Sequence, residues 1–311
     1  MAESRFAEIK RILARPFLTR ISDKMEILRN RFLLGLSPLL FMRYRYLKEA
    51  RKWYDHKNPR TFDEKLLWLN LYWRHPLKAR CADKYAVRSY VEEHGMGHLL
   101  TELLGMYANS SEIDFSRLPD RFVLKCTHGC GFNVFCTDKS RLDVEETRRK
   151  LNAWMKLDIS KFTGEMHYVS IKPRIICEAY LEGLPGKPIN DYKVYCFHGK
   201  AHCTMACTDR TEKGAKYDFY DREWKNKLRY SKSSLLVDRT IPKPEAYEEI
   251  IQAAEALSKP FPFVRMDFYS INGKAVFGEM TFTPHGCIDT LMTDLAQDVM
   301  GDLLKLPKKR L

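Results

Sequence analysis

The sequence contains no apolar run long enough to cross a membrane. Its longest apolar stretch, residues 32–42, is interrupted by Gly35, Ser37 and Pro38, and a spanning helix needs roughly 18 or more apolar residues. The first residues, MAESRFAEIKRIL, lack the apolar core of a signal peptide. We therefore expect a cytoplasmic protein, with contact at the inner face of the membrane as its closest approach to lipid.

Several motifs of catalysis and binding are also missing. There is no G-x-S-x-G, no Walker P-loop and no pair of aspartates two residues apart, the pattern with which many glycosyltransferases hold metal. No helix-turn-helix, zinc-finger or RNP-type pattern is present, so nucleic acid is not the expected partner. The nine cysteines are odd in number and include no C-x2-C pair, so we expect reduced thiols in a reducing compartment.

An excess of positive charge is present instead, and it is concentrated at the start. The net charge is +13, and residues 1–52 hold 13 Lys and Arg against 5 Asp and Glu. Apolar side chains recur there at helical spacing: Phe6, Ile9, Ile12 and Leu13, then, beyond Pro16, Met25, Leu28 and Phe32. This pattern predicts two or three helices. They either pack against the rest of the protein or contact a polyanion, namely an anionic membrane or an acidic glycan.

The segment Phe263–Gly286 predicts a β-hairpin. Apolar and polar residues alternate from Val264 to Tyr269, the period of a half-buried strand. Asn272-Gly273 is a favoured two-residue hairpin turn, and Lys274–Met280 is the expected return strand.

Two acids lie on the two strands of this predicted hairpin. If Asp267 and Glu279 share a face, two carboxylates converge, and Arg265 is the only nearby charge expected to offset them. Mg²⁺ usually takes one or two protein carboxylates and completes its shell with water and phosphate oxygens. The pair therefore leaves two alternatives open, a magnesium site and an exposed hairpin with solvated charges.

A second candidate site follows the predicted strand RFVLKC, residues 121–126. Lys125 supplies a point charge near its end, and Gly129 and Gly131 lie in the next loop. Glycine lets backbone N–H groups approach phosphate oxygens closely. By itself the segment fits either a phosphate site or an ordinary hairpin.

These motifs, in this order, resemble the ATP-grasp superfamily. Arg-x-Asp, a hairpin and then Glu-x-Thr-x-Thr-Pro is similar to the family's metal-binding end, with Thr281 where Asn is usual. The segments NPRTFDEKLLW (58–68) and ADKYAVRSYV (82–91) resemble its TupA-like branch, which is associated with teichuronopeptide and other surface polysaccharides. The resemblance extends from about Asn58 to the end of the chain.

The resemblance implies a nucleotide site. Lys84, expected on a helix over residues 81–95, and Lys125 would reach the phosphates of ATP under the loop with Gly129 and Gly131. Glu178 would accept from the adenine amino group. The backbone from Ala179 to Leu181 would pair with the edge of the ring.

The resemblance also implies a reaction centre. Asp191 would lie at the ribose-binding position, and Lys193 projects from the same face. Arg265 would face the transferred phosphate, so Arg265 and Lys193 are the implied catalytic residues. The implied metal ligands are Asp267, Glu279 and Thr281.

The implied fold is α+β, an ATP-grasp fold of two lobes that clamp a nucleotide, with a helical N-terminal region. We expect a basic helical region at 1–57, an N-terminal lobe at 58–120 and an ATP-grasp core at 121–311. The implied activity is ATP-dependent carboxylate–amine ligation through an acyl phosphate, with ATP and Mg²⁺, in the synthesis of a cell-surface polysaccharide or teichuronopeptide-like polymer. The acceptor would be an acidic glycan or an amino acid. A glycosyltransferase, an ATP-grasp phosphotransferase with a non-carboxylate acceptor and a non-catalytic nucleotide-binding module stay open as alternatives.

Overall fold

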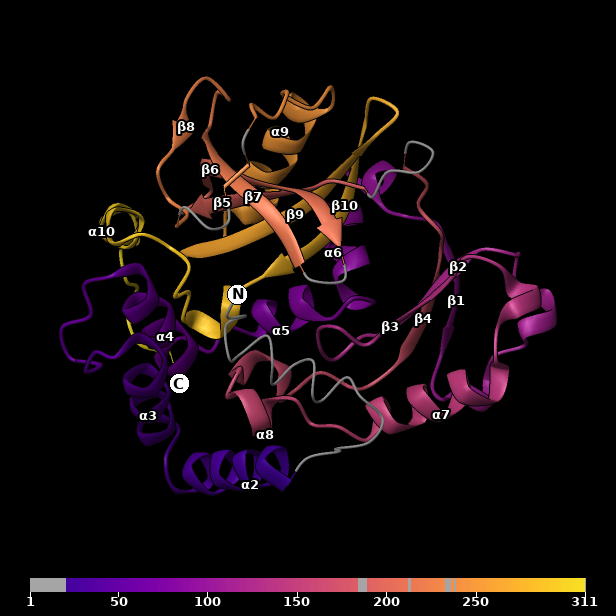
Figure 1. The fold of residues 1–311 in the computed structure, drawn as a ribbon, viewed down its shortest axis with the longest axis horizontal. Coiled ribbons are helices and arrows are strands. Elements are labelled where there is room, and N and C mark those ends of the chain that lie inside the picture. The colour runs from indigo at the N-terminus through magenta and orange to yellow at the C-terminus, as the bar shows by residue number, and fades with distance from the viewer. Residues whose placement is uncertain (1–20, 184–188, 212–213, 233–235, 238, 311) are drawn as a thin grey trace. The chain divides into compact units, whose positions relative to one another are not determined.

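The chain folds into two compact units, each assembled from separate stretches of sequence (Figure 1). The structure is a computed structural model, and it describes residues 21–183, 189–211, 214–232, 236–237 and 239–310. Unit 1 comprises the described part of Met1–Tyr54 together with Arg74–Ser89 and Thr101–Leu181, and unit 2 comprises Asp55–Trp73, Tyr90–Leu100 and the described part of Glu182–Leu311. Each unit combines helices with an antiparallel sheet, which confirms the α+β class. The expected boundaries at 57/58 and 120/121 stay a prediction.

The described part of the basic N-terminal region forms two helices of unit 1, α2 (Ile21–Leu36) and α3 (Pro38–Ala50). Ser37 is the N-cap of α3, and its hydroxyl accepts from the Leu40 amide. Pro38 suits the first helical position because that position needs no N–H donor. The predicted stripe from Phe6 to Leu13 and the break at Pro16 lie outside the described residues. No helix in the described part of the chain is long and apolar enough to span a membrane.

Unit 1 is built around a four-stranded antiparallel sheet in the order β1-β4-β2-β3. Its strands and remaining helices are β1 (Leu103–Tyr107), β2 (Phe122–Cys126), β3 (Asn133–Cys136), β4 (Ile175–Ala179), α5 (Pro76–Ala82), α7 (Val144–Met155) and α8 (Ser160–Thr163). The helix α7 packs against β2. Trp154 of α7 stacks on Phe132 at 5.6 Å between ring centroids, and both side chains are buried. Burial of such rings contributes about 1.5–3 kcal/mol each.

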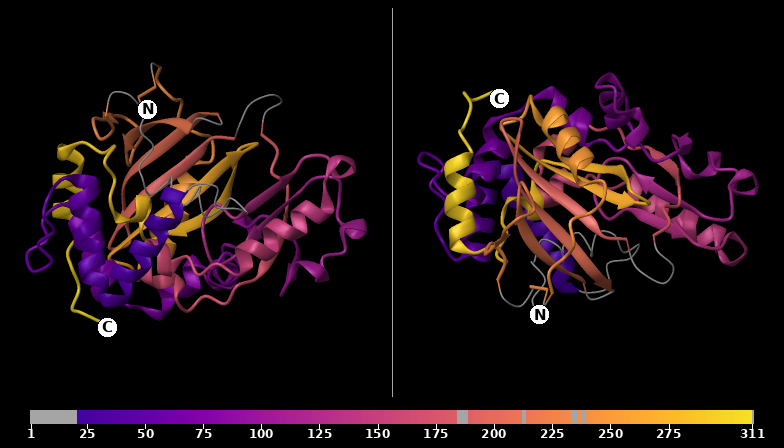
Figure 2. Two further views of the ribbon diagram at one scale, coloured as in Figure 1. Left: turned by 60° about the horizontal axis from the view of Figure 1, so that its bottom comes forward. Right: turned by 90° about the horizontal axis from the view of Figure 1, so that it is seen from above.

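Unit 2 is built around a six-stranded antiparallel sheet in the order β10-β9-β5-β6-β7-β8. Its elements are β5 (Asp191–Phe197), β6 (Lys200–Thr211), β7 (Gly214–Asp221), β8 (Lys227–Leu228), β9 (Phe263–Ile271), β10 (Lys274–Thr281), α4 (Phe62–Tyr72), α9 (Tyr247–Ser258) and α10 (Asp294–Leu303). The apolar side of α9 covers β5, β6 and β9, and α10 packs beside α4 (Figure 2).

The helix α4 begins with a capping box. The Thr61 hydroxyl accepts from the Glu64 amide, and the Glu64 carboxylate accepts from the Thr61 amide. This cap places Phe62 at the start of the helix, where its ring lies 4.9 Å from that of Phe263 and 5.9 Å from that of Phe197. The stretch 55–73 thus supplies a side chain to the core of unit 2 from far away in the sequence.

The hairpin of β9 and β10 forms as predicted, with Asn272 and Gly273 both at positive φ in the turn. One irregularity decides its geometry. Phe277 pairs with Phe268, but the next pair is Glu279 with Asp267, so Gly278 is an extra residue in β10. Strict alternation would place Glu279 opposite Met266 and away from Asp267. The bulge at Gly278 brings the two acids into register.

The single helix predicted over residues 81–95 is wrong. The helix α5 ends at Ala82 and α6 (Ala86–Glu93) begins after a turn. The buried Asp83 carboxylate accepts from the amides of Tyr85 and Ala86, which satisfies donors at the start of α6 and ends the preceding helix. Lys84 therefore lies in a turn and not on a helix.

Candidate active site

The first group of predicted residues lies in unit 1 and centres on Glu178. This residue is on β4 and is buried. Lys125 of β2 donates to its Oε2 at 2.5 Å, and Arg88 of α6 donates to its Oε1 at 3.2 Å. One carboxylate thus lies between two cations, an arrangement that leaves a net positive charge on this face. Arg88, which lies on α6 four residues after Lys84, was not predicted.

The glycine loop of unit 1 is held by the other predicted lysine. Lys84 Nζ donates to the Gly129 carbonyl at 2.5 Å. Gly131 has φ +76°, a conformation that strains other residues, and a Cβ at Gly129 would lie 2.7 Å from the Phe132 ring. The loop therefore requires glycine at both predicted positions, for its turn at one and for packing at the other.

The segment after Glu178 is partly engaged in the sheet. The Ala179 amide donates to the Glu102 carbonyl at 3.0 Å. The carbonyl of Ala179 and the backbone of the half-buried Leu181 are the other groups that the resemblance implies for adenine. Their contact with a nucleotide stays a prediction.

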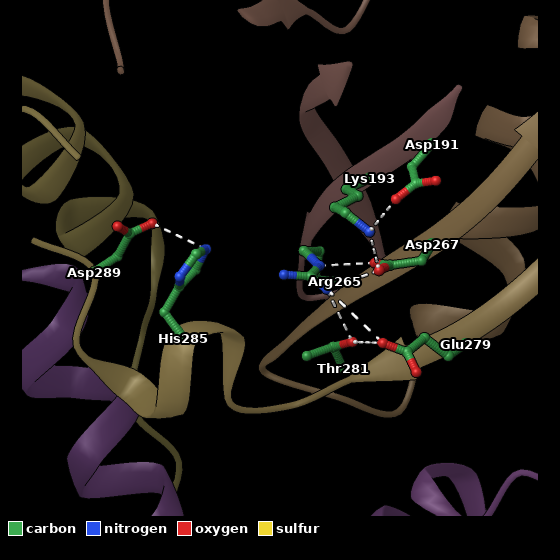
Figure 3. Close-up of polar contacts among 8 residues, drawn as sticks. All are labelled: Asp191, Lys193, Arg265, Asp267, Glu279, Thr281, His285 and Asp289. Carbon is green, nitrogen blue, oxygen red and sulfur yellow. Dashed lines mark hydrogen bonds and ion pairs between the residues drawn. The ribbon is translucent and has the colours of Figure 1, made fainter. Parts of the chain in front are cut away.

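The second group of predicted residues lies in unit 2 and centres on Asp267 (Figure 3). Lys193 of β5, the register partner of Asp267, donates to Oδ2 at 2.6 Å. Arg265 Nε donates to Oδ1 and its Nη2 to Oδ2, both at 2.7 Å. Lys193 also lies 3.3 Å from an oxygen of Asp191. The expectation that Arg265 alone offsets the acids was therefore wrong, because Lys193 lies one strand away in the sheet and not near them in sequence.

Glu279 and Thr281 extend this cluster along β10. The Thr281 hydroxyl donates to Glu279 Oε1 at 3.1 Å and accepts from Arg265 Nη2 at 3.2 Å. The side chain of Glu279 is 40% exposed, against 9% for Asp267. Glu279 is therefore the member of the pair with the greater access to solvent.

The two cations of the cluster keep their charge. Burial opposes the ammonium of Lys193, but the carboxylates of Asp267 and Asp191 outweigh it and raise its pKa above the ordinary value. Burial likewise opposes the charge on Arg265, and Asp267 outweighs it, so its pKa is also raised. The site thus presents fixed positive charge beside its carboxylates at any physiological pH.

The donor set fits magnesium. Asp267 and Glu279 offer carboxylates from paired strands, and Thr281 adds a hydroxyl. Among the described residues, no three His, Cys, Asp or Glu side chains gather as a metal cluster. Mg²⁺ needs only one or two carboxylates, so a pair of them is sufficient for that ion.

A histidine that was not predicted lies just beyond β10. His285, in the short helical turn η7 (Pro284–Cys287), has its Nε2 3.5 Å from Oδ2 of the buried Asp289 (Figure 3). His285, Gly286 and Cys287 are consecutive residues at positive φ, 49°, 64° and 72°. Such backbone strain often occurs at functional sites. The turn begins only three residues after Thr281, and this closeness in sequence to a predicted metal ligand is the signal that could have identified His285.

Comparison with known proteins agrees with these motifs. A family described as TupA-like ATPgrasp matches residues 64–305. Similar solved structures are D-alanine–D-alanine ligase from Bacillus anthracis (15% identity, TM-score 0.44, covering 79% of this chain and 69% of that one) and D-cycloserine synthetase DcsG (14%, 0.42, 74% and 72%). A third is the ATP-grasp ligase PsnB, solved with a phosphomimetic precursor variant, Mg and ADP (13%, 0.40, 86% and 70%). No curated protein matches. Because the family match covers most of its length, the chain belongs to the TupA-like ATP-grasp family and is an enzyme of the ATP-grasp ligase class.

Proposed function

We propose that the protein is an ATP-dependent carboxylate–amine ligase that acts through an acyl phosphate in the synthesis of a cell-surface polysaccharide or teichuronopeptide-like polymer. The observation that carries this proposal is the cluster of Lys193, Arg265, Asp267 and Glu279, which combines fixed cations with magnesium-type ligands. A carboxylate is a poor electrophile until it is phosphorylated. Phosphoryl transfer requires positioning and neutralisation of charge more than an activated nucleophile on the protein.

Each residue of the cluster has a task in this reaction. Asp267 and Glu279 would hold Mg²⁺, with Thr281 beside them, and the ion would neutralise charge on the phosphates. Arg265 would stabilise the negative charge that develops on the transferring phosphoryl group. Lys193 would hold the Asp267 carboxylate in its orientation through their hydrogen bond.

The residues of unit 1 would bind the nucleotide. Lys125 would contact phosphate oxygens and Glu178 the adenine amino group, with Arg88 holding the Glu178 carboxylate in place. The loop with Gly129 and Gly131, held by Lys84, would present backbone amides to the phosphates.

The test of this proposal is a screen for ADP release. The purified protein is given Mg·ATP with amino acids and uronic-acid oligosaccharides, singly and in pairs. A ligase releases ADP only with a carboxylate and an amine together, and hydroxylamine traps its acyl phosphate as a hydroxamate. ADP release with a non-carboxylate acceptor would identify a phosphotransferase, and sugar transfer without ATP consumption a glycosyltransferase. Absence of ATP binding by calorimetry would refute the whole assignment.

We further propose that α2 contacts an anionic lipid surface, which would place the enzyme at the inner face of the membrane. Met25, Leu28, Phe32 and Leu36, here called the apolar strip, recur at one face of α2 and are 61–67% exposed. Large apolar side chains exposed together commonly mark a contact surface.

Charge supports lipid as the occupant of the apolar strip. Arg31 on α2 and Arg51 and Lys52 after α3 are exposed, so the surroundings are basic. An anionic headgroup layer complements them, whereas residues 1–20 carry five Lys and Arg against two Asp and Glu and would add positive charge.

Sedimentation with vesicles tests this contact. Full-length protein should sediment with phosphatidylcholine–phosphatidylglycerol vesicles and less with pure phosphatidylcholine. Phe32→Ser should weaken binding by roughly tenfold or more, since burial of a Phe is worth about 1.5–3 kcal/mol. Phe135→Ser is the matched control, because Phe135 on β3 is equally exposed, at 64% against 65%.

Three outcomes would contradict lipid binding. Wild type that ignores both kinds of vesicle would do so. Binding only by a chain that starts at residue 21 would show that residues 1–20 cover the strip. A dimer that Phe32→Ser dissociates would identify a second copy as the occupant.

A further inference from the structure

The pair of His285 and Asp289 has the form of an oriented base. Asp289 is 7% exposed, and its Oδ1 accepts from the Leu291 amide, which holds the carboxylate in place. Its Oδ2 faces His285 Nε2 at 3.5 Å. A carboxylate beside one ring nitrogen favours the tautomer with its proton there and leaves the lone pair on the other nitrogen, here Nδ1. The His285 side chain is 25% exposed, so solutes can reach it.

The pair lies near the cluster of Lys193, Arg265, Asp267 and Glu279, called here the phosphoryl-transfer cluster. The buried hydroxyl of Tyr195 lies within electrostatic range of both Asp289 and Arg265. Burial and Asp289 raise its pKa, and Arg265 opposes that rise. In Figure 3 the His285 ring lies between Asp289 and Arg265. Arg265 also contacts Thr281, and the η7 turn with His285 begins three residues after Thr281.

Two buried hydroxyls mark the same region as polar. Burial first, then Asp289, raises the pKa of Tyr217 as well. The hydroxyls of Tyr195 and Tyr217 have no hydrogen-bond partner among the described residues. Buried polar groups without partners are uncommon and indicate space for a further polar molecule.

Carboxylate–amine ligation needs a base that the phosphoryl-transfer cluster does not provide. The amine nitrogen attacks the carbonyl carbon of the acyl phosphate, the C–N bond forms, and phosphate leaves with the electron pair of the C–O bond. The attacking nitrogen must lose a proton. Lys193 and Arg265 are held in their charged forms and cannot accept it.

We propose that His285, oriented by Asp289, is the general base that removes this proton from the attacking amine, with Nδ1 as the acceptor atom. The proposal rests on the ligase function proposed above. It places the amine on the η7 side of Arg265. The substrate class of this subsite is then a protonated amine, which Asp289 attracts.

The test separates acylation from transfer. The wild type and His285→Asn are compared with the carboxylate–amine pair that gives the highest ADP release in the screen, and then with hydroxylamine in place of that amine. Hydroxylamine is largely unprotonated at neutral pH, and water can take the proton that its nitrogen loses after attack, so it does not depend on a base from the protein. Asparagine tolerates positive φ, as histidine does, so the turn should survive. We expect amide formation to fall roughly 10²- to 10⁴-fold, with hydroxamate formation within about threefold of wild type.

Two further variants sharpen the test. Asp289→Asn should cause a loss of the same selective kind, because it disturbs the orientation of His285 and removes the charge that attracts the amine. His98→Gln is the matched control: His98 faces Glu249 at 3.2 Å in the same unit, but its side chain is 61% exposed. It should leave both reactions unchanged.

The alternatives give distinct results. Equal loss of amide and hydroxamate in His285→Asn would overturn the base assignment while leaving the ligase intact, and so would unchanged amide formation. Wild type that forms hydroxamate with no carboxylate would instead overturn the ligase function, and the base assignment with it.

Discussion

At the scale of single residues, Arg265 and Lys193 share one carboxylate, and this sharing separates their roles. Arg265→Ala leaves Asp267 paired with Lys193, so the proposed metal ligand keeps one of its two cationic partners. We expect turnover to fall roughly 10²- to 10³-fold, because the charge of Arg265 matters most where negative charge develops. The affinity for Mg·ATP, measured by calorimetry, should change much less.

The control is Arg239→Ala. Arg239 makes a similar bidentate contact with Asp209, but both side chains are largely exposed, so its loss should change neither quantity. An Arg265→Ala variant that loses affinity and turnover equally would show that Arg265 binds the ground state.

The cysteines offer a second test of the nucleotide assignment. Burial raises the pKa of Cys126 and of Cys177 to about 12, so almost no thiolate forms there at neutral pH. Cys130, between the two loop glycines, is half-buried, whereas the other eight cysteines are buried. An alkylating reagent should therefore modify Cys130 first, and Mg·ATP should slow the reaction.

Mass spectrometry identifies the modified residue, and Cys130→Ser should abolish this first phase. Labelling of Cys130 at the same rate with and without Mg·ATP would mean that the loop does not cover a bound nucleotide.

At the scale of elements, the bulge in β10 determines whether the two acids meet. A Cβ at Gly278 would lie 2.8 Å from the Asp267 carbonyl oxygen, closer than any packed structure allows. Gly278→Ala should shift the register locally and weaken Mg²⁺ binding roughly 10- to 100-fold, the usual cost of misplacing a supporting group. The Mg²⁺ dependence of ADP release measures it.

Gly35→Ala in α2 is the control, since its Cβ would meet nothing within 4 Å. Alanine is the better helix former there, so stability should stay equal or rise. Unchanged Mg²⁺ dependence in Gly278→Ala would show that the acids do not need this register.

The predictability of the elements follows from where their determinants lie. The hairpin and the cap of α4 could be predicted because Asn272-Gly273 and Thr61 with Glu64 act over a few residues. The pairing of Lys193 with Asp267 could not, because it depends on which strand lies beside β9. The bulge could not either, since Gly278 is one of several glycines and only its close approach to Asp267 distinguishes it.

At the scale of the whole molecule, each unit is assembled from separate stretches of the sequence, so its stability depends on segments that are distant along the chain. Phe62 is 1% exposed and contacts rings of β5 and β9. Phe62→Ala should therefore lower the free energy of unfolding by about 3–5 kcal/mol. Denaturant unfolding followed by circular dichroism measures it, and Trp53→Ala, at an exposed aromatic, should change it by less than about 1 kcal/mol. Equal effects of the two variants would exclude a structural role for Phe62.

The packing of Phe62 also has a consequence for the order of events during synthesis. A ribosome releases α4 long before it has made β5 or β9, the strands that bury this ring. Until then the apolar side of α4 has no native surface to cover it, and exposed surface of this kind favours aggregation. Completion of unit 2 must therefore wait for almost the entire chain, and translation of the last third sets the earliest moment at which the proposed metal site can exist.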